Sequence, residues 1–150
     1  MVAPNKFSES LRRLLPGLWL GLLLAIALIA TPAASNALDK ASFGAVARAI
    51  FAREAPTSLV LGVLILVIER RDALARHLAT GVTQFSTEML LAAGALFCTV
   101  AGYYGLLPAL EQARLGGPTQ LSFLQLHALS LAFFGLKGLL VLALAWKATR

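Results

Sequence analysis

Residues 14–34 read LLPGLWLGLLLAIALIATPAA and contain no charged side chain. An α-helix rises about 1.5 Å per residue, and the hydrocarbon layer of a bilayer is about 30 Å thick, so an apolar stretch of about 20 residues is long enough to cross it. Pro16 falls in the opening turn of this stretch, where proline is tolerated. The stretch therefore predicts a membrane-spanning helix.

Three further apolar stretches complete the pattern, at about residues 50–70, 89–110 and 123–146. Their apolar runs are continuous and rich in Leu and Ala, which favours helices over strands. Only 13% of the chain is charged, against about 25% in soluble domains. We expect an all-α fold in which residues 1–150 form a single transmembrane domain, a four-helix bundle embedded in the lipid bilayer.

The first stretch has an alternative interpretation as a cleavable secretory signal. Lys6, Arg12 and Arg13 precede it, and the small residues of segment 31–37 follow it. Its apolar run of about 17 residues is longer than the usual 7–15 of a signal peptide. We therefore expect the first helix to stay in the protein.

Basic residues predict the orientation of the bundle. Eight Lys and Arg residues lie in the two terminal segments and in the connection between the second and third stretches, and four lie in the other two connections. Because basic residues accumulate in cytoplasmic loops, we expect both termini in the cytoplasm. On so apolar a chain, the net charge of +6 indicates such loops and not a nucleic-acid site.

Two of the stretches resemble each other. Segment 22–34, LLLAIALIATPAA, and segment 90–102, LLAAGALFCTVAG, are identical at seven of thirteen aligned positions. One interpretation is a pair of related helical hairpins, as in transporters built from parallel repeats. The alternative, which we favour, is a match between two Leu- and Ala-rich compositions.

Small residues predict where helices pack. Gly17 and Gly21 form a G-x-x-x-G motif in the first stretch, and Gly94, Cys98 and Gly102 have the same spacing in the third. Small residues at this spacing let helix backbones approach closely in lipid. We expect packing within the chain, with a homodimer as the alternative.

Three polar residues lie on one face of the fourth stretch. His127, Ser130 and Lys137 fall within an arc of about 80° at 100° per residue. An ionisable group inside the bilayer costs about 2.5–3.5 kcal/mol and normally faces the bundle interior. We expect Lys137 to form an ion pair with Glu88, with Glu69 as a second possible partner. The alternatives are that Lys137 extends to the headgroups or provides a positive charge for an anionic ligand.

His127 is the main candidate for a functional site. It lies near the outer end of the fourth stretch, at the expected level of Asn36, Asp39 and Glu54. An imidazole beside carboxylates can bind a divalent metal or relay a proton. The alternative, which we favour, is a structural histidine that hydrogen-bonds a neighbouring helix.

Five segments carry a resemblance to a known family: LWLG at 18–21, ATPAASNALDKA at 30–41, IFAREA at 50–55, FCTVAGYY at 97–104 and SFLQLHALSLAFFGLK at 122–137. Together they resemble a bacterial family of unknown function that is similar to eukaryotic transmembrane protein 205. The resemblance implies a four-helix protein of the bacterial inner membrane with no assigned activity. Its L-H-x-x-S element corresponds to Leu126, His127 and Ser130, whereas the Asn that the family often shows is replaced here by Phe134 or Gly135. A more remote likeness links such bundles to copper handling.

The motifs expected of common enzymes are missing from the sequence, which contains no G-x-x-x-x-G-K-[ST], H-E-x-x-H or G-x-S-x-G. We therefore expect a membrane protein that is not an enzyme, with no cofactor indicated and with binding of a metal ion or small ligand around His127 as its candidate function. The alternatives are an accessory or scaffold subunit of a larger membrane protein, or a small dimeric transporter.

Overall fold

The computed structural model describes residues 6–150, which form helices and loops without any strand in that range. Four helical segments within it are long and apolar enough to cross a membrane: Lys6–Ala37, Lys40–Thr80, Thr87–Arg114 and Phe123–Ala148. The predicted all-α class and the four predicted spans are confirmed. Each span is longer than the apolar stretch that predicted it, because the helix continues into flanking residues that include polar and charged side chains.

The first and third spans each contain a turn of π-helix. The first runs through α1 (Lys6–Ala25), η1 (Ile26–Ala30) and α2 (Thr31–Ala37). The third runs through α4 (Thr87–Thr99), η2 (Val100–Gly105) and α5 (Leu107–Arg114). In both, a proline follows the π-helix in the first turn of the next α-helix, Pro32 in one and Pro108 in the other.

The second span is a single helix, α3 (Lys40–Thr80), and it extends about ten residues beyond the predicted range at each end. Asp39 caps its start by accepting hydrogen bonds from the backbone N–H groups of Ala41 and Ser42, the usual role of Asp at this position. Gly81 ends it in a left-handed conformation with φ of 71°, which glycine adopts at no steric cost. With 41 residues, α3 is about 62 Å long at 1.5 Å per residue.

The fourth span is α6 (Phe123–Ala148). Ser122 and Gln125 begin it with a reciprocal cap, in which each side chain accepts a hydrogen bond from the backbone N–H of the other. This capping box satisfies two backbone donors that the first turn would otherwise leave free. The start of α6 is therefore fixed four residues before His127.

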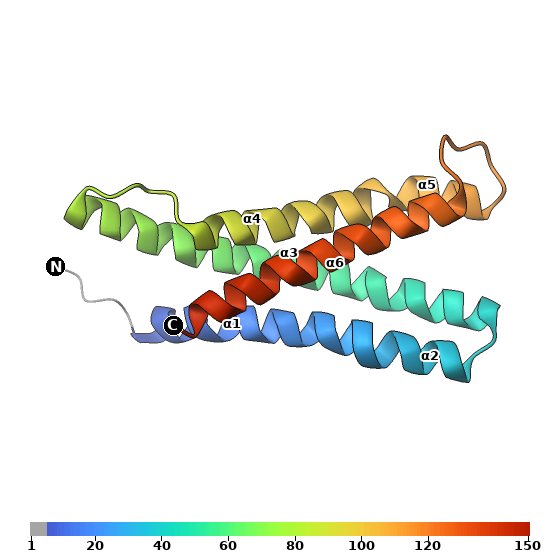
Figure 1. The fold of residues 1–150 in the computed structure, drawn as a ribbon, viewed down its shortest axis with the longest axis horizontal. Coiled ribbons are helices and arrows are strands. Elements are labelled where there is room, and N and C mark those ends of the chain that lie inside the picture. The colour runs from blue at the N-terminus through green and yellow to red at the C-terminus, as the bar shows by residue number, and fades with distance from the viewer. Residues whose placement is uncertain (1–5) are drawn as a thin grey trace.

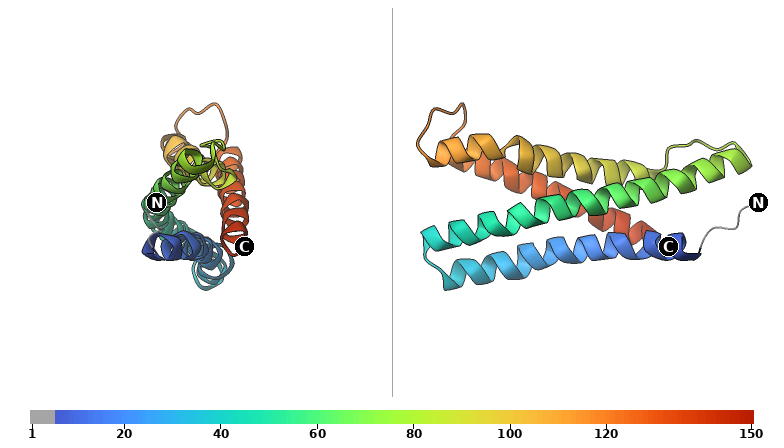
Figure 2. Two further views of the ribbon diagram at one scale, coloured as in Figure 1. Left: turned by 90° about the vertical axis from the view of Figure 1, so that its left-hand side faces the viewer. Right: turned by 180° about the vertical axis from the view of Figure 1, so that it is seen from behind.

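The spans form a closed four-helix arrangement in which α1 packs against α3 and α6, and α4 packs against the same two helices. Figures 1 and 2 show α6 crossing the bundle, with the start of α1 and the end of α6 at the same end, here called the terminal end. The last turns of α3 project beyond the bundle there (Figure 1). Both α3 and α6 begin at the opposite end.

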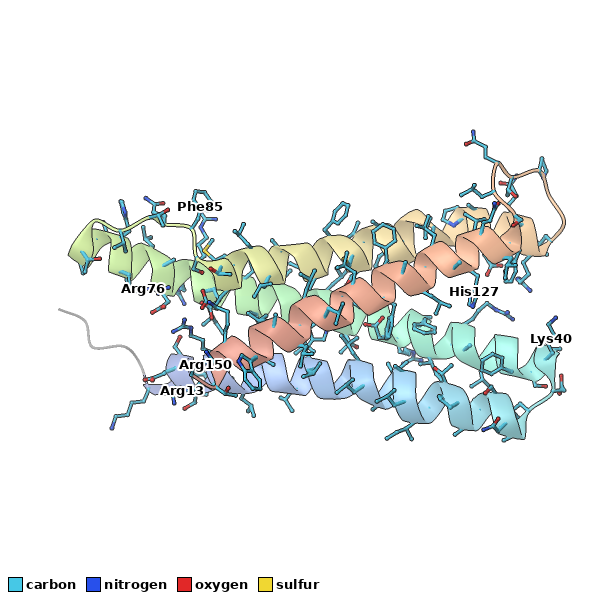
Figure 3. All side chains as sticks on the ribbon, viewed as in Figure 1. Arg13, Lys40, Arg76, Phe85, His127 and Arg150 are labelled. Carbon is cyan, nitrogen blue, oxygen red and sulfur yellow. The ribbon has the colours of Figure 1, made fainter. Side chains whose placement is uncertain are left out.

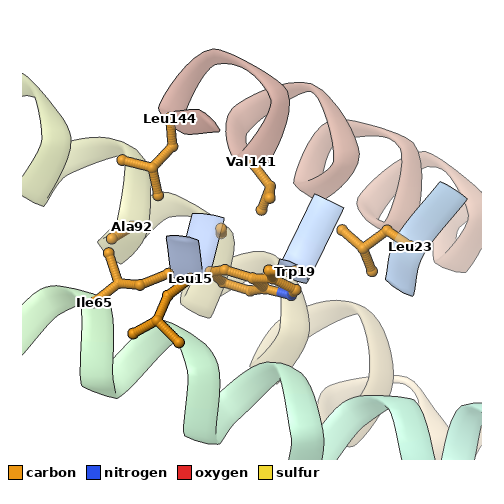
Figure 4. Close-up of a cluster of buried hydrophobic side chains, with 8 residues drawn as sticks. Leu15, Trp19, Leu23, Ile65, Ala92, Val141 and Leu144 are labelled. Carbon is orange, nitrogen blue, oxygen red and sulfur yellow. The ribbon is translucent and has the colours of Figure 1, made fainter. Parts of the chain in front are cut away.

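Apolar side chains cover the outside of the bundle (Figure 3), among them the exposed Leu18, Val63 and Leu139. Inside, one buried cluster joins all four spans around Trp19, which is fully buried against Leu15, Ile65, Ala92 and Val141 (Figure 4). An apolar exterior together with a packed interior is the arrangement expected of helices surrounded by lipid.

Candidate functional site

A buried ion pair lies in the middle of the bundle. The Lys137 Nζ atom of α6 donates to Glu54 Oε1 of α3 at 2.6 Å, and both side chains are at most 4% exposed. Each residue lies 14 positions after the start of its helix, which is a depth of about 21 Å at 1.5 Å per residue. Because α3 and α6 begin at the same end of the bundle, the two charges lie at the same level.

Two further side chains extend this pair to α1. Ser58, one turn after Glu54, donates to the same Glu54 oxygen. Trp19 Nε1 of α1 donates to Ser58 Oγ at 2.8 Å. Lys137 Nζ also lies 4.9 Å from the centre of the Phe134 ring, within the range of a cation–π contact. The result is a neutral hydrogen-bonded network, here called the central network, that fixes α1, α3 and α6 in register.

The predicted partners of Lys137 are wrong. Glu88 pairs with Lys147 at 3.3 Å, and Glu69 pairs with Arg12 at 2.7 Å, both at the terminal end. The prediction placed Glu54 at the outer interface because it began the second helix near residue 50. Since α3 begins ten residues earlier, Glu54 lies in the bundle interior.

The structure does not assemble the predicted cluster around His127. The His127 ring is exposed and stacks on the Phe123 ring, with centroids 6.0 Å apart (Figure 3). Asp39 caps α3, Asn36 is exposed near the end of α2, and Glu54 lies about 15 Å deeper than His127, counted as ten residues of helix. Among residues 6–150, no group of three or more His, Cys, Asp or Glu is placed to hold a metal ion. The prediction of a cluster there is wrong.

The other two members of the predicted polar stripe do face the bundle. Lys137 is buried in the central network, and Ser130 Oγ donates to the backbone carbonyl of Gly102 at 3.2 Å. This contact joins α6 to η2. His127 lies about 60° from Ser130 and about 80° from Lys137 around α6, and it alone of the three is exposed.

The predicted close packing is found at the glycines of the third span but not at those of the first. A Cβ added at Gly102 would meet Phe133 Cβ at 2.4 Å, and one at Gly94 would meet Leu140 at 3.2 Å, so both glycines allow α6 to pack closely. Gly17 and Gly21 are exposed, with no neighbouring atom within 4 Å of an added Cβ. Their predicted packing within the chain is wrong, because they lie about 200° around α1 from the buried Trp19.

A second group of charges surrounds a cavity at the terminal end. The partly enclosed cavity has a volume of about 300 Å³, and every span contributes a charged wall residue: Arg12 from α1, Glu69 from α3, Glu88 from α4 and Lys147 from α6. Arg12 Nε donates to Glu69 Oε1, while Arg12 Nη1 lies 3.4 Å from Asp72. We call this space the terminal cavity.

Glu69 differs from the other acids in the terminal cavity. It is only 2% exposed, and its second carboxylate oxygen, Oε2, is buried without a hydrogen-bond partner among residues 6–150. A buried acceptor without a donor costs about 1–3 kcal/mol. From the sequence, Glu69 was predicted only as an alternative partner for Lys137. Its ion pair with Arg12 could not be predicted, because it depends on how α1 packs against α3.

The sequence analysis did not identify Trp19 and Ser58 as members of a site. Two signals were available: Ser58 lies one turn from Glu54, and Trp19 shares its helix face with Leu15 and Leu23, which lie four residues away on either side. Neither signal identifies the helix that the face contacts.

The sequence profile of one family, described as Domain of unknown function (DUF4149), matches residues 14–119. No curated protein and no solved structure matches the chain, so the likeness to transmembrane protein 205 stays a prediction. The matched range contains Trp19, Glu54, Ser58 and Glu69, and it ends before α6. Because it covers more than half of the chain, the protein belongs to the DUF4149 family.

Proposed function

We propose that this protein is a membrane protein without enzymatic activity that binds a polar ligand in the terminal cavity. The unpaired Glu69 Oε2 carries this proposal. Buried polar groups in folded proteins are nearly always hydrogen-bonded, and the explanations for an exception include a bound water or ion and a functional role. A ligand that donates to this oxygen would remove its desolvation penalty.

The surroundings of Glu69 favour a ligand over a purely structural role. The central network satisfies its charges within the chain, since Glu54 accepts from both Lys137 and Ser58. Glu69 instead lines a space of about 300 Å³, which is at the lower end of the range of about 300–1,000 Å³ for ligand pockets. We therefore assign ligand binding to the terminal cavity and bundle stability to the central network.

Native mass spectrometry of the full chain, purified in a mild detergent, tests this proposal. The wild-type protein should retain a bound adduct, and Glu69→Gln should lose most of it. Arg12 keeps Asp72 as a partner in this variant, which favours correct folding.

Glu111→Gln is the matched control, because Glu111 forms an ion pair of the same 2.7 Å length with Arg114 but lies on α5, away from the terminal cavity. This variant should retain the adduct. An absence of any adduct on the wild-type protein, or an equal amount on the wild type and Glu69→Gln, would contradict the proposal.

We also propose that the terminal end faces the cytoplasm of a bacterial inner membrane. Eight of the basic residues lie at this end and three at the other, and Arg53 and Lys137 lie between them at the level of the central network. The positive-inside rule supports this orientation. The terminal cavity would then lie at the level of the cytoplasmic headgroups.

A second candidate function is that of an accessory subunit or homodimer. Gly17 and Gly21 support it, because their G-x-x-x-G face is exposed and unpacked. Such a face fits closely against a second helix in lipid. Cross-linking of the full chain in native membranes tests this candidate. Gly21→Leu should reduce the amount of cross-linked dimer. Gly135→Leu is the control and should leave it unchanged, since an added Cβ at Gly135 also has no neighbouring atom within 4 Å.

A further inference from the structure

The charges in the wall of the terminal cavity do not balance. Three ion pairs can be formed, between Glu9 and Arg13, Glu69 and Arg12, and Glu88 and Lys147. Arg150 also lines the cavity, and its guanidinium lies 5.4 Å from the centre of the Trp146 ring. Within residues 6–150 it has no carboxylate partner among the ion pairs of the structure. In the part of the chain that the structure describes, the cavity wall therefore contains one cation without a carboxylate partner, and one of its residues, Glu69, has a buried carboxylate oxygen without a hydrogen-bond partner.

An apolar groove adjoins the terminal cavity on the outer face of α6. Leu139, Leu142, Ala143 and Trp146 line it, and Lys147 belongs to the walls of both spaces. The groove is shallow and open, and all of its lining residues belong to α6. Since α6 is one of the four candidate membrane spans, this groove faces the region that acyl chains occupy.

We propose that the terminal cavity and this groove together bind one phospholipid whose headgroup carries a phosphate and a primary ammonium, as in phosphatidylethanolamine. The inference rests on the proposed ligand-binding function and specifies its ligand. Arg150 and Lys147 bind the phosphate, the ammonium donates to Glu69 Oε2, and an acyl chain lies along α6 between Leu139 and Trp146.

The chemistry of the two unpaired groups selects this headgroup. A phosphate is a strong acceptor for a guanidinium. The carboxylate oxygen needs an N–H or O–H donor, which excludes phosphatidylcholine because its quaternary ammonium has none. Phosphatidylglycerol supplies only uncharged hydroxyl donors, whereas a primary ammonium adds the Coulomb attraction of a cation to its hydrogen bond with the carboxylate.

Thermal unfolding of the delipidated full chain in detergent tests the headgroup. Phosphatidylethanolamine, phosphatidylglycerol and phosphatidylcholine with identical acyl chains serve as probes. We expect phosphatidylethanolamine to raise the Tm at a concentration at least tenfold lower than either competitor, and Glu69→Gln to remove this difference. Glu111→Gln should behave as the wild type does.

A second comparison separates the lipid from its free headgroup. Ala143→Trp should fill the groove and weaken phosphatidylethanolamine binding at least tenfold, while free phosphoethanolamine should bind only weakly and equally to the variant and the wild type. Ala132→Trp is the matched control, since Ala132 is exposed on the same helix outside the groove. Equal weakening by both tryptophan variants would contradict the groove assignment.

The two proposals fail in different ways. If native mass spectrometry detects a Glu69-dependent adduct but the three lipids stabilise the protein equally, the headgroup assignment is wrong and the terminal cavity remains a ligand site. If no such adduct exists, both proposals are wrong. If free phosphoethanolamine binds at the same concentration as phosphatidylethanolamine, the acyl chain contributes nothing to binding. That result would overturn the phospholipid assignment.

Discussion

Glu54 and Lys137 show how a charge is accommodated inside a bundle surrounded by lipid. Removing each charge from water costs several kcal/mol, and their attraction compensates only when the remaining hydrogen-bonding capacity is also used. Here Ser58 donates to the same carboxylate, and Trp19 in turn donates to Ser58. The pair therefore fixes the register of three helices more than it adds net stability.

This view predicts the effect of breaking the pair. Lys137→Met should destabilise the bundle by about 3–5 kcal/mol, because it leaves the Glu54 carboxylate buried without its countercharge. Adding Glu54→Gln should recover much of that loss. Denaturation of the wild type, of Lys137→Met and of the double variant in detergent measures these values.

Lys147→Met is the control for this experiment, since Lys147 forms its ion pair at the more exposed terminal end. It should cost about 1 kcal/mol or less, as pairs near the surface do. A double variant that is no more stable than Lys137→Met alone would contradict the assignment of a coupled pair.

The sequence predicted the kind of interaction at Lys137 correctly, but not its partner. An intramembrane lysine requires a partner, so an ion pair followed directly from its position. The partner depended on where the second helix begins. The prediction began this helix ten residues after its true start at Lys40, which misplaces Glu54 by about 15 Å along the helix axis. Glu54 was therefore expected too far from Lys137 to pair with it, and Glu88 was predicted as the partner.

The helix starts show how short polar motifs determine the elements. Asp39 lies in the two-residue connection between α2 and α3, outside both spans. Its carboxylate accepts hydrogen bonds from the side chain and backbone of Ser42 and from the backbone of Ala41. These bonds hold the pKa of Asp39 below its ordinary value of 3.8, and the Ser42 hydroxyl has the largest effect.

The cap should therefore depend on pH in a defined direction. Because the folded pKa is the lower one, the stabilisation of α3 by ionised Asp39 is complete above the ordinary value of 3.8 and is lost as the pH falls through the folded pKa. Carbon-13 NMR titration of the Asp39 carboxyl in micelles should give a midpoint below 3.8. Ser42→Ala should raise this midpoint, and a wild-type midpoint at or above 3.8 would rule out the proposed cap.

Some glycines of the bundle lie directly against another helix, and others have open space beside them. Gly102 contacts Phe133 so closely that an added Cβ would lie 2.4 Å from Phe133 Cβ, whereas Gly138 has open space. Gly102→Ala should destabilise the bundle by about 1–3 kcal/mol through overpacking. Gly138→Ala should be neutral or stabilising by up to about 1 kcal/mol, since alanine favours the helix. Thermal unfolding in detergent compares the two variants, and equal Tm values would contradict this packing.

The spacing of small residues predicted which helices have close-packing faces, but not which of these faces are used. The small-residue motifs of the first and third spans look alike in sequence, yet of their glycines only Gly94 and Gly102 contact another helix within the chain. On α1 the inward face is instead set by Trp19 and its apolar neighbours one turn away. The similar segments 22–34 and 90–102 also differ in structure at equivalent positions. The π-helix η1 begins at Ile26 in the first segment, whereas η2 begins at Val100, near the end of the second.

For the whole molecule, hydropathy alone predicted the class and number of the elements, because lipid requires helices of a minimum length. The terminal cavity could not be predicted in the same way. Its walls come from four spans and include Arg12, Glu69 and Lys147, which lie far apart in the sequence. Only the packed bundle brings them together.

The central claim is that four spans place the terminal cavity at the cytoplasmic face of the membrane. Single cysteines test it most directly, introduced in a Cys98→Ser background as Thr83→Cys between α3 and α4 and as Gln120→Cys between α5 and α6, both at exposed positions. With a membrane-impermeant maleimide on intact spheroplasts, we predict labelling of the Gln120→Cys protein, and labelling of the Thr83→Cys protein only after the membrane is opened. Labelling of the Thr83→Cys protein in intact spheroplasts would contradict the claim.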